Sequence, residues 1–161
     1  NMIDRLALAT KFENGDFTTQ PTTFDLVKLT QEMVQGFREK HPTRTIRTEF
    51  PATYMISADR TMIELVISNL IDNALKYSEE EITLVLEGDA LHVKDQGMGI
   101  KSEEIEKVTQ KFYRSNSHTW DNSMGLGLAL VNYILKLHNT NLEIQSSLGV
   151  GSDFSFKLPS N

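Results

Sequence analysis

Residues 69–77 read Asn-Leu-Ile-Asp-Asn-Ala-Leu-Lys-Tyr, and the rest of the chain is organised around them. They close a long apolar pattern that is typical of a helix. At about 100° per residue the apolar side chains share one stripe, whereas Asn69, Asn73 and Lys76 fall on a neighbouring stripe, with Tyr77 between the two. Amides are weaker helix formers than Glu or Lys. Two asparagines one turn apart beside a core stripe therefore indicate either a binding site or a pair of satisfied amides at the helix edge.

The composition excludes several classes of protein. The chain has 161 residues, which suits one domain with a real core. It carries 16 Lys and Arg against 22 Asp and Glu, a net charge of −6. This acidity argues against a nucleic-acid-binding surface and a polybasic membrane anchor, so we expect no nucleic-acid partner. The absence of cysteine excludes disulfides, thiolate metal sites and cysteine nucleophiles. No apolar run approaches the ~18 residues of a membrane span.

The first half of the chain alternates helical and extended patterns. Residues 1–15 predict the end of an amphipathic helix stopped by Asn14-Gly15, and residues 16–23, which are polar and contain Pro21, predict a linker. Further apolar patterns predict a helix over 24–39 that begins after Asp25, strands over 45–50 and 53–57, and a helix over 59–77 that begins after Asp59.

A hairpin follows, and its second strand ends in an acidic residue. The strands are predicted over 82–86 and 91–95, with Gly88-Asp89 at the turn. Because side chains alternate between the two faces of a strand, Asp95 shares the face of the apolar residues and points inward. An inward carboxylate is costly unless a hydrogen-bond donor satisfies it.

The second half predicts a mobile polar loop over 115–124, a helix over 125–138 and a closing hairpin made of residues 142–146 and 154–158. The predicted fold is an α/β two-layer sandwich. It has a mixed, mostly antiparallel sheet of about five strands, with about three helices on one face.

Four motifs occur in this order: Asn69…Asn73 with Lys76-Tyr77, Asp95-Gln96-Gly97-Met98-Gly99, Phe112-Tyr113-Arg114, and Gly125-Leu126-Gly127-Leu128. Each is weak alone, because glycine pairs usually mark turns or steric relief. Together they resemble the ATP-binding catalytic domain of sensor histidine kinases, which shares a superfamily with gyrase-type topoisomerases and heat-shock ATPase chaperones. The resemblance covers about residues 24–158, and it includes Gly149-Val150-Gly151-Ser152 as the last glycine motif.

The resemblance implies that the chain binds ATP and Mg²⁺. Asp95 would accept a hydrogen bond from the adenine amino group, a charge-assisted bond of roughly 1.5–3 kcal/mol. Gly97 and Gly99 would let the backbone approach the base. Asn73 would be the metal ligand, because magnesium prefers oxygen ligands. Tyr77 would lie against the base or ribose.

The phosphates would meet a second set of residues. Asn69, Lys76 and Arg114 are the predicted catalytic residues, with Arg114 in the loop that corresponds to the ATP lid of the family. The helix predicted to begin at Gly125 would direct free N–H groups at the phosphates. The residues assigned to the nucleotide there are Ser123, Gly125, Leu126, Gly127 and Leu128. Ser123 stands where the family often has a third glycine.

The function implied by the resemblance is transfer of the ATP γ-phosphoryl group to a histidine on an upstream helical hairpin. None of the four histidines lies in the acceptor context of the family. We therefore expect residues 1–15 to be the last turns of that dimerisation and acceptor hairpin, and residues 24–161 to be the catalytic domain. The expected partners are the hairpin and a response regulator. The fragment would be monomeric and its parent a homodimer, either cytoplasmic or the cytoplasmic part of a membrane-bound sensor.

Three other functions stay open. A topoisomerase-like ATPase would carry a glutamate base one turn before the magnesium asparagine, where this chain has Asn69, and an amide does not accept a proton from water near neutral pH. An anti-sigma serine/threonine kinase would be a complete small protein without a helix remnant at its start. A regulatory module without transfer activity would not be expected to keep Asn73, Asp95 and Gly125 intact.

Overall fold

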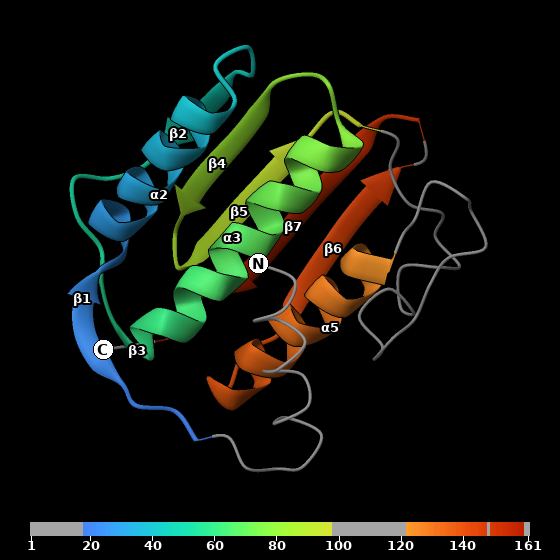
Figure 1. Cartoon of the computed structure of the whole chain (residues 1–161). Helices are drawn as coiled ribbons and strands as arrows, with labels where there is room; N and C mark the ends of the chain where they lie inside the picture. Colours follow the sequence, from blue (N-terminus) through green and yellow to red (C-terminus); the bar gives the residue numbers. More distant parts are fainter. Residues whose placement is uncertain (1–17, 98–121, 148, 160–161) are drawn as a thin grey trace.

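A five-stranded mixed sheet forms one layer of the computed structural model, which describes residues 18–97, 122–147 and 149–159 (Figure 1). The strand order is β2-β4-β5-β7-β6, with β2 parallel to β4 and the other neighbours antiparallel. The bounds are Ile46–Glu49 for β2, Ile82–Glu87 for β4, Ala90–Asp95 for β5, Leu142–Ser147 for β6 and Gly151–Lys157 for β7. The predicted sheet is thereby confirmed.

Within the described residues, three helices cover one face of this sheet (Figure 1). They are α2 (Leu26–Lys40), α3 (Arg60–Tyr77) and α5 (Asn122–Leu137). Alternate strand residues, among them Leu84, Leu91 and Phe156, are fully buried against the helices. Each such side chain contributes about 1.5–3 kcal/mol relative to an exposed one. The two-layer α/β sandwich predicted from the sequence is confirmed.

The first strand differs from the sequence-based expectation. β1 (Thr22–Asp25) begins inside the segment 16–23 that the sequence predicts as a linker. It pairs antiparallel with β3 (Met55–Ala58) in a separate two-stranded sheet. β-branched threonines suit a strand, but only the distant partner strand decides that they form one. The helix predicted over residues 1–15 lies outside the described residues.

The caps of α2 and α3 agree with the sequence. One carboxylate oxygen of Asp25 accepts from the N–H of Val27 at 3.0 Å and from that of Tyr54, also at 3.0 Å. The carboxylate of Asp59 accepts from the N–H of Met62 at 3.2 Å. A side chain at this position satisfies a donor that the first helical turn leaves unpaired.

Asp59 also joins three distant segments. Its second carboxylate oxygen accepts from the N–H of Gln20 at 3.0 Å, and its own N–H donates to Nε2 of His138 at 3.1 Å. Because Nε2 accepts, the proton of the neutral imidazole sits on Nδ1, which lies 2.9 Å from the carbonyl oxygen of Ile134 and donates to it. His138 therefore ties the end of α5 to the start of α3, a contact that no local sequence pattern indicates.

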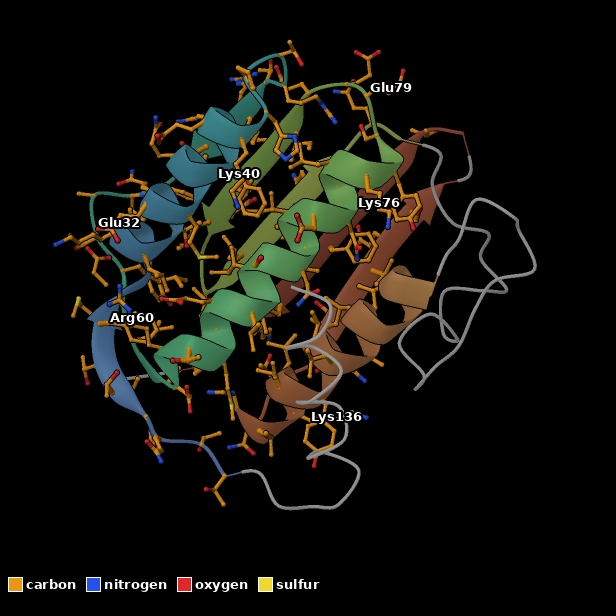
Figure 2. All side chains as sticks on the ribbon, in the orientation of Figure 1. Glu32, Lys40, Arg60, Lys76, Glu79 and Lys136 are labelled. Carbon is orange, nitrogen blue, oxygen red and sulfur yellow. The ribbon has the colours of Figure 1, made fainter. Side chains whose placement is uncertain are left out.

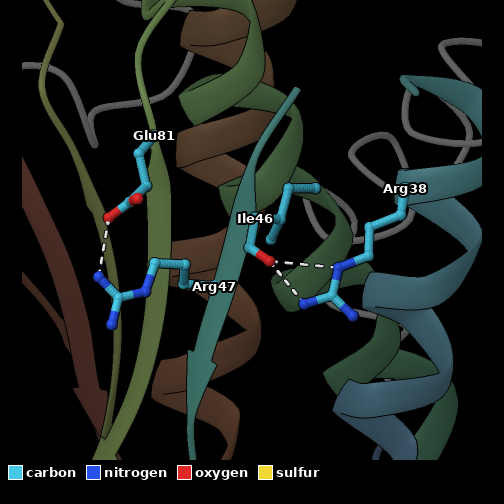
Figure 3. A network of polar contacts seen from close by, with 4 residues as sticks. All are labelled: Arg38, Ile46, Arg47 and Glu81. Atoms are coloured by element: carbon cyan, nitrogen blue, oxygen red, sulfur yellow. Dashed lines mark hydrogen bonds and ion pairs between the residues drawn. The ribbon is translucent and has the colours of Figure 1, made fainter. Parts of the chain in front are cut away.

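Two arginines hold β2 at the edge of the sheet (Figure 3). Arg38, in the last turn of α2, donates from Nε at 3.2 Å and from Nη2 at 2.5 Å to the carbonyl oxygen of Ile46. Arg47 forms a 3.3 Å ion pair with Glu81 across the sheet. Because Arg47 is exposed and Glu81 is only partly buried, this pair contributes little, about 0–1 kcal/mol.

Candidate functional site

Asn69 lies at the contact between α3 and α5. Its side chain is only 2% exposed, and its Nδ2 donates to the carbonyl oxygen of Leu65 at 2.7 Å. A Cβ added to Gly127 would lie 2.9 Å from Oδ1 of Asn69, so glycine lets the two helices approach. Asn69 is thus a satisfied amide in a helix interface. The catalytic role suggested for it stays a prediction.

Asn73, one turn further along α3, has a different environment. The side chain is half-buried, and its Nδ2 is buried without a hydrogen-bond partner in the described part of the chain. Leaving such a group unsatisfied costs about 1–3 kcal/mol. A bound polar group would remove this cost, and the amide oxygen is a ligand type that magnesium accepts. Because Nδ2 is a donor, this environment favours contact with an acceptor such as a phosphate oxygen, whereas the magnesium-ligand role of the Asn73 oxygen stays a prediction.

The end of α3 borders a pocket of about 390 Å³. We call it the α3-end pocket; its lining residues are Lys76, Tyr77, Ser78, Glu79, Glu80, Gln96 and Gly97. Nζ of Lys76 lies 5.8 Å from the centre of the Tyr77 ring, within the range of a cation–π contact. Figure 2 shows Lys76 near the end of α3 and Glu79 beyond it at the same end of the molecule. The structure thus brings together residues from two of the four sequence motifs.

Asp95 ends β5, where its partner across the sheet is Ser152 of β7. The side chain is half-buried, as its inward orientation predicts. Burial raises the pKa of Asp95, while hydrogen bonds from the backbone N–H groups of Gly97 and Ser152 act in the opposite direction. The bond from Gly97 is 2.8 Å long. A half-buried carboxylate with a raised pKa is typical of functional sites.

Asp95 lines a second pocket of about 470 Å³, which contains neither Lys76 nor Tyr77. Gln96 lines both pockets. The sequence pattern did not indicate this role for the residue between Asp95 and Gly97. Thr83, Lys94, Gln145 and Asp153, which also line this pocket, form one row on the sheet face that turns away from the buried Leu84 and Val93. The pocket therefore does not place the inward side chain of Asp95 beside Lys76 and Tyr77.

Two glycines fix the backbone around Asp95. A Cβ on Gly97 would lie 2.2 Å from the carbonyl oxygen of Tyr77, so the loop after β5 packs directly on the end of α3. A Cβ on Gly151 would lie 2.2 Å from the carbonyl oxygen of Asp95, and Gly151 also has φ +148°, which other residues rarely adopt. From the sequence, Gly97 is expected to let the backbone approach a ligand. In the structure its immediate reason is the contact with Tyr77.

The helix α5 begins at Asn122, before the predicted start at Gly125. Gly125 and Gly127 therefore lie within its first two turns, and the free N–H groups of a helix start belong to residues near Asn122. Leu128 is fully buried in the core, so it supports the site only through packing. The side chains of Ser123 and Leu126, and all of Gly99 and Arg114, lie outside the described residues.

Comparison with known proteins points to the same family as the sequence motifs. Residues 58–161 match the family model described as "Histidine kinase-, DNA gyrase B-, and HSP90-like ATPase". The adaptive-response sensory kinase SasA of Crocosphaera subtropica is 30% identical over 171 residues, which cover 98% of this chain and 44% of that protein. The chain therefore spans less than half of this curated relative.

Solved structures agree with the fold. Histidine kinase AdeS of Acinetobacter baumannii superposes with a TM-score of 0.76 at 22% identity, over 99% of this chain and 77% of that one. The catalytic domain of histidine kinase ThkA gives a TM-score of 0.70 at 25% identity, over 88% of this chain and 96% of that one. With more than half of its residues matched by the family model, the chain belongs to the histidine kinase-, DNA gyrase B- and HSP90-like ATPase family.

Proposed function

We propose that this chain is the ATP-binding kinase module of a two-component sensor and that it transfers the γ-phosphoryl group of ATP to a histidine on an upstream hairpin. The observation that carries the proposal is the position of Asp95 beside the end of α3, which carries Asn73, Lys76 and Tyr77. A Cβ on Gly97 would contact both the carbonyl oxygen of Tyr77 and Oδ1 of Asp95. The relatives named as sensory and histidine kinases support the same function.

In this proposal Asp95 selects adenine. Its carboxylate accepts a hydrogen bond from the exocyclic amino group, whereas guanine would present a carbonyl oxygen and leave the carboxylate unpaired. Gln96 and Gly97, which follow Asp95 directly, also line the α3-end pocket. Lys76 and Tyr77 would meet the phosphates and the ribose or base.

The magnesium site would be centred on Asn73. Among the described residues, no group of three or more His, Asp or Glu side chains is placed to hold a metal ion. A magnesium ion would therefore need the phosphate oxygens and water besides the amide oxygen, which is the usual arrangement for magnesium with nucleotides. The bound ion would neutralise charge on the phosphates.

Catalysis would consist of positioning and charge stabilisation, as in other phosphoryl transfers. Lys76 would supply positive charge from α3, and Arg114 would supply it from the lid. Asn69 would keep α3 and α5 in register, because it occupies their interface. The acceptor histidine would come from the hairpin that precedes this domain, and a response regulator would receive the phosphoryl group afterwards. We place the module in the cytoplasm because of its resemblance to the kinase modules of two-component sensors. Separately, no helix within the described ranges is long and apolar enough to cross a membrane.

A labelling experiment tests the function. Incubated with γ-labelled ATP and magnesium, the chain alone should stay unlabelled and release phosphate slowly. A separate polypeptide that carries the upstream hairpin of the same protein should become labelled on its histidine, weakly, because the contact is no longer intramolecular. Acid-labile label on the chain itself would contradict the proposal. Fast phosphate release without transfer would support the topoisomerase-like ATPase instead.

A further inference from the structure

Arg44 lies between α2 and β2, yet its guanidinium binds the end of a different helix. Nη1 donates to the carbonyl oxygen of Leu75 at 2.7 Å. Nη2 donates to the carbonyl oxygen of Ser78 at 2.6 Å and to that of Glu80 at 3.3 Å. The last carbonyls of a helix have no partner within it, and they carry the negative end of the helix dipole. A cation with several donors therefore suits this position.

The backbone held by Arg44 forms one wall of the α3-end pocket. The residues of that wall follow Leu75 directly and are Lys76, Tyr77, Ser78, Glu79 and Glu80. Shortly after the wall, the N–H of Ile82 donates to the carbonyl oxygen of Thr45 at 3.0 Å. Arg44 and its neighbour Thr45 thus bind both ends of the segment.

We propose that Arg44 is a positioning residue for the nucleotide, which keeps the last turn of α3 and residues 78–80 in the arrangement that receives ATP. The inference rests on the proposed function, because it treats the α3-end pocket as part of the ATP site. Arg44 acts through the backbone of the pocket wall and does not touch the nucleotide. Its Nε is buried without a partner among the described residues, so within that part of the chain Nη1 and Nη2 make its hydrogen bonds, to the three carbonyls.

Lysine does not replace arginine in this role. The guanidinium is a planar fork whose two nitrogens reach the carbonyls of Leu75 and Ser78 at the same time. An ammonium group keeps the charge but has one nitrogen, which does not bridge two carbonyls with the same geometry. Arg44→Lys therefore keeps the positive charge and removes the two-nitrogen fork, whereas Arg44→Met removes both.

Arg38 provides a matched control. It also lies near the end of α2, and its guanidinium also binds a backbone carbonyl, that of Ile46 (Figure 3). Ile46 belongs to β2 and lines neither pocket. Arg38→Lys and Arg38→Met thus remove hydrogen bonds from a guanidinium to a backbone carbonyl, at a more exposed position than Arg44, without releasing the pocket wall.

The experiment is calorimetric titration of the wild type and the four variants with a magnesium complex of a non-hydrolysable ATP analogue, and separately with adenosine. Circular dichroism first establishes that each variant is folded at the titration temperature. Both Arg44 variants should bind both ligands about tenfold more weakly, which corresponds to a fall of the binding-competent fraction to about a tenth. The Arg38 variants should bind within about twofold of the wild type.

Three results would overturn the inference. The first is wild-type affinity for both ligands in a folded Arg44 variant. The second is an equal loss of affinity in the Arg38 and Arg44 variants. The third is a loss of affinity for the ATP analogue, but not for adenosine, in Arg44→Met together with wild-type affinity in Arg44→Lys. The last result would mean that only the charge matters. A wild-type protein that binds neither ligand would overturn the proposed function as well, and this is recognised before any variant is measured. If Arg44→Met does not fold, Arg44→Lys carries the test.

Discussion

Replacing Asp95 by asparagine should weaken ATP binding and stabilise the protein at the same time. Asparagine keeps the shape of the side chain and an oxygen that accepts from the N–H of Gly97, now at 2.8 Å. It removes the negative charge, and its NH₂ group faces a donor if it points at the adenine amino group. The lost charge-assisted bond is worth about 1.5–3 kcal/mol, which predicts about 10- to 150-fold weaker binding.

The stability effect has the opposite sign because burial raises the pKa of Asp95. A raised pKa means that the folded state binds more protons than the unfolded state between the ordinary aspartate value of 3.8 and the raised pKa. The stabilising contribution of the protonated carboxyl is therefore complete below the ordinary value and is lost as the pH rises through the raised pKa. The asparagine variant, which does not titrate, should gain free energy of unfolding relative to the wild type over that pH range and keep the gain above it.

The assay combines calorimetric titration with a non-hydrolysable ATP analogue and urea unfolding at several pH values. Asp89→Asn, in the turn before β5, is the matched control, because Asp89 is exposed and lines neither pocket. It should change neither quantity by a measurable amount. An Asp95→Asn variant with unchanged ATP affinity would remove Asp95 from the nucleotide site. A variant that is less stable than the wild type at neutral pH would show that the hydrogen bonds of the carboxylate outweigh its burial.

Three further predictions concern other parts of the fold. Asn73→Ala should abolish the magnesium-dependent part of ATP affinity and leave adenosine binding nearly intact. Titrations with and without magnesium measure both affinities, and equal losses for ATP and adenosine would point to misfolding. Gly127→Ala should lower the free energy of unfolding by about 1–3 kcal/mol, because its Cβ would meet the Asn69 amide oxygen at 2.9 Å. Gly36→Ala, where a Cβ meets nothing within 4 Å, is the control and should raise the free energy of unfolding by about 0.5–1 kcal/mol. Urea unfolding measures both variants, and a similar change in Gly127→Ala and Gly36→Ala would refute the steric explanation. His138→Ala should destabilise the protein by about 0.5–1.5 kcal/mol, because the part-buried N–H of Asp59 at the start of α3 loses its acceptor. No change in the urea midpoint would show that water replaces the imidazole.

Local sequence patterns determined much of the fold. The apolar period of residues 60–77 predicted α3, and Asp25 and Asp59 predicted the caps of two helices, because a cap contacts a backbone N–H only a few positions away. Alternation along β5 predicted the inward side chain of Asp95, since the period of a strand is two wherever it pairs. The motifs, taken in order, indicated the family, which the comparison confirmed.

Only the tertiary structure decided which distant groups meet. Arg44 contacts the carbonyl of Leu75, 31 positions away, and His138 accepts from Asp59, 79 positions away. The pairing of β1 with β3 and the contact of Gly97 with Tyr77 are of the same kind. Periodicity reports which face of an element is buried, but it carries no information about which element covers that face. The sequence alone therefore determined the elements and the inward carboxylate, whereas packing of α3 against α5 and the loop after β5 decided how the candidate site is assembled.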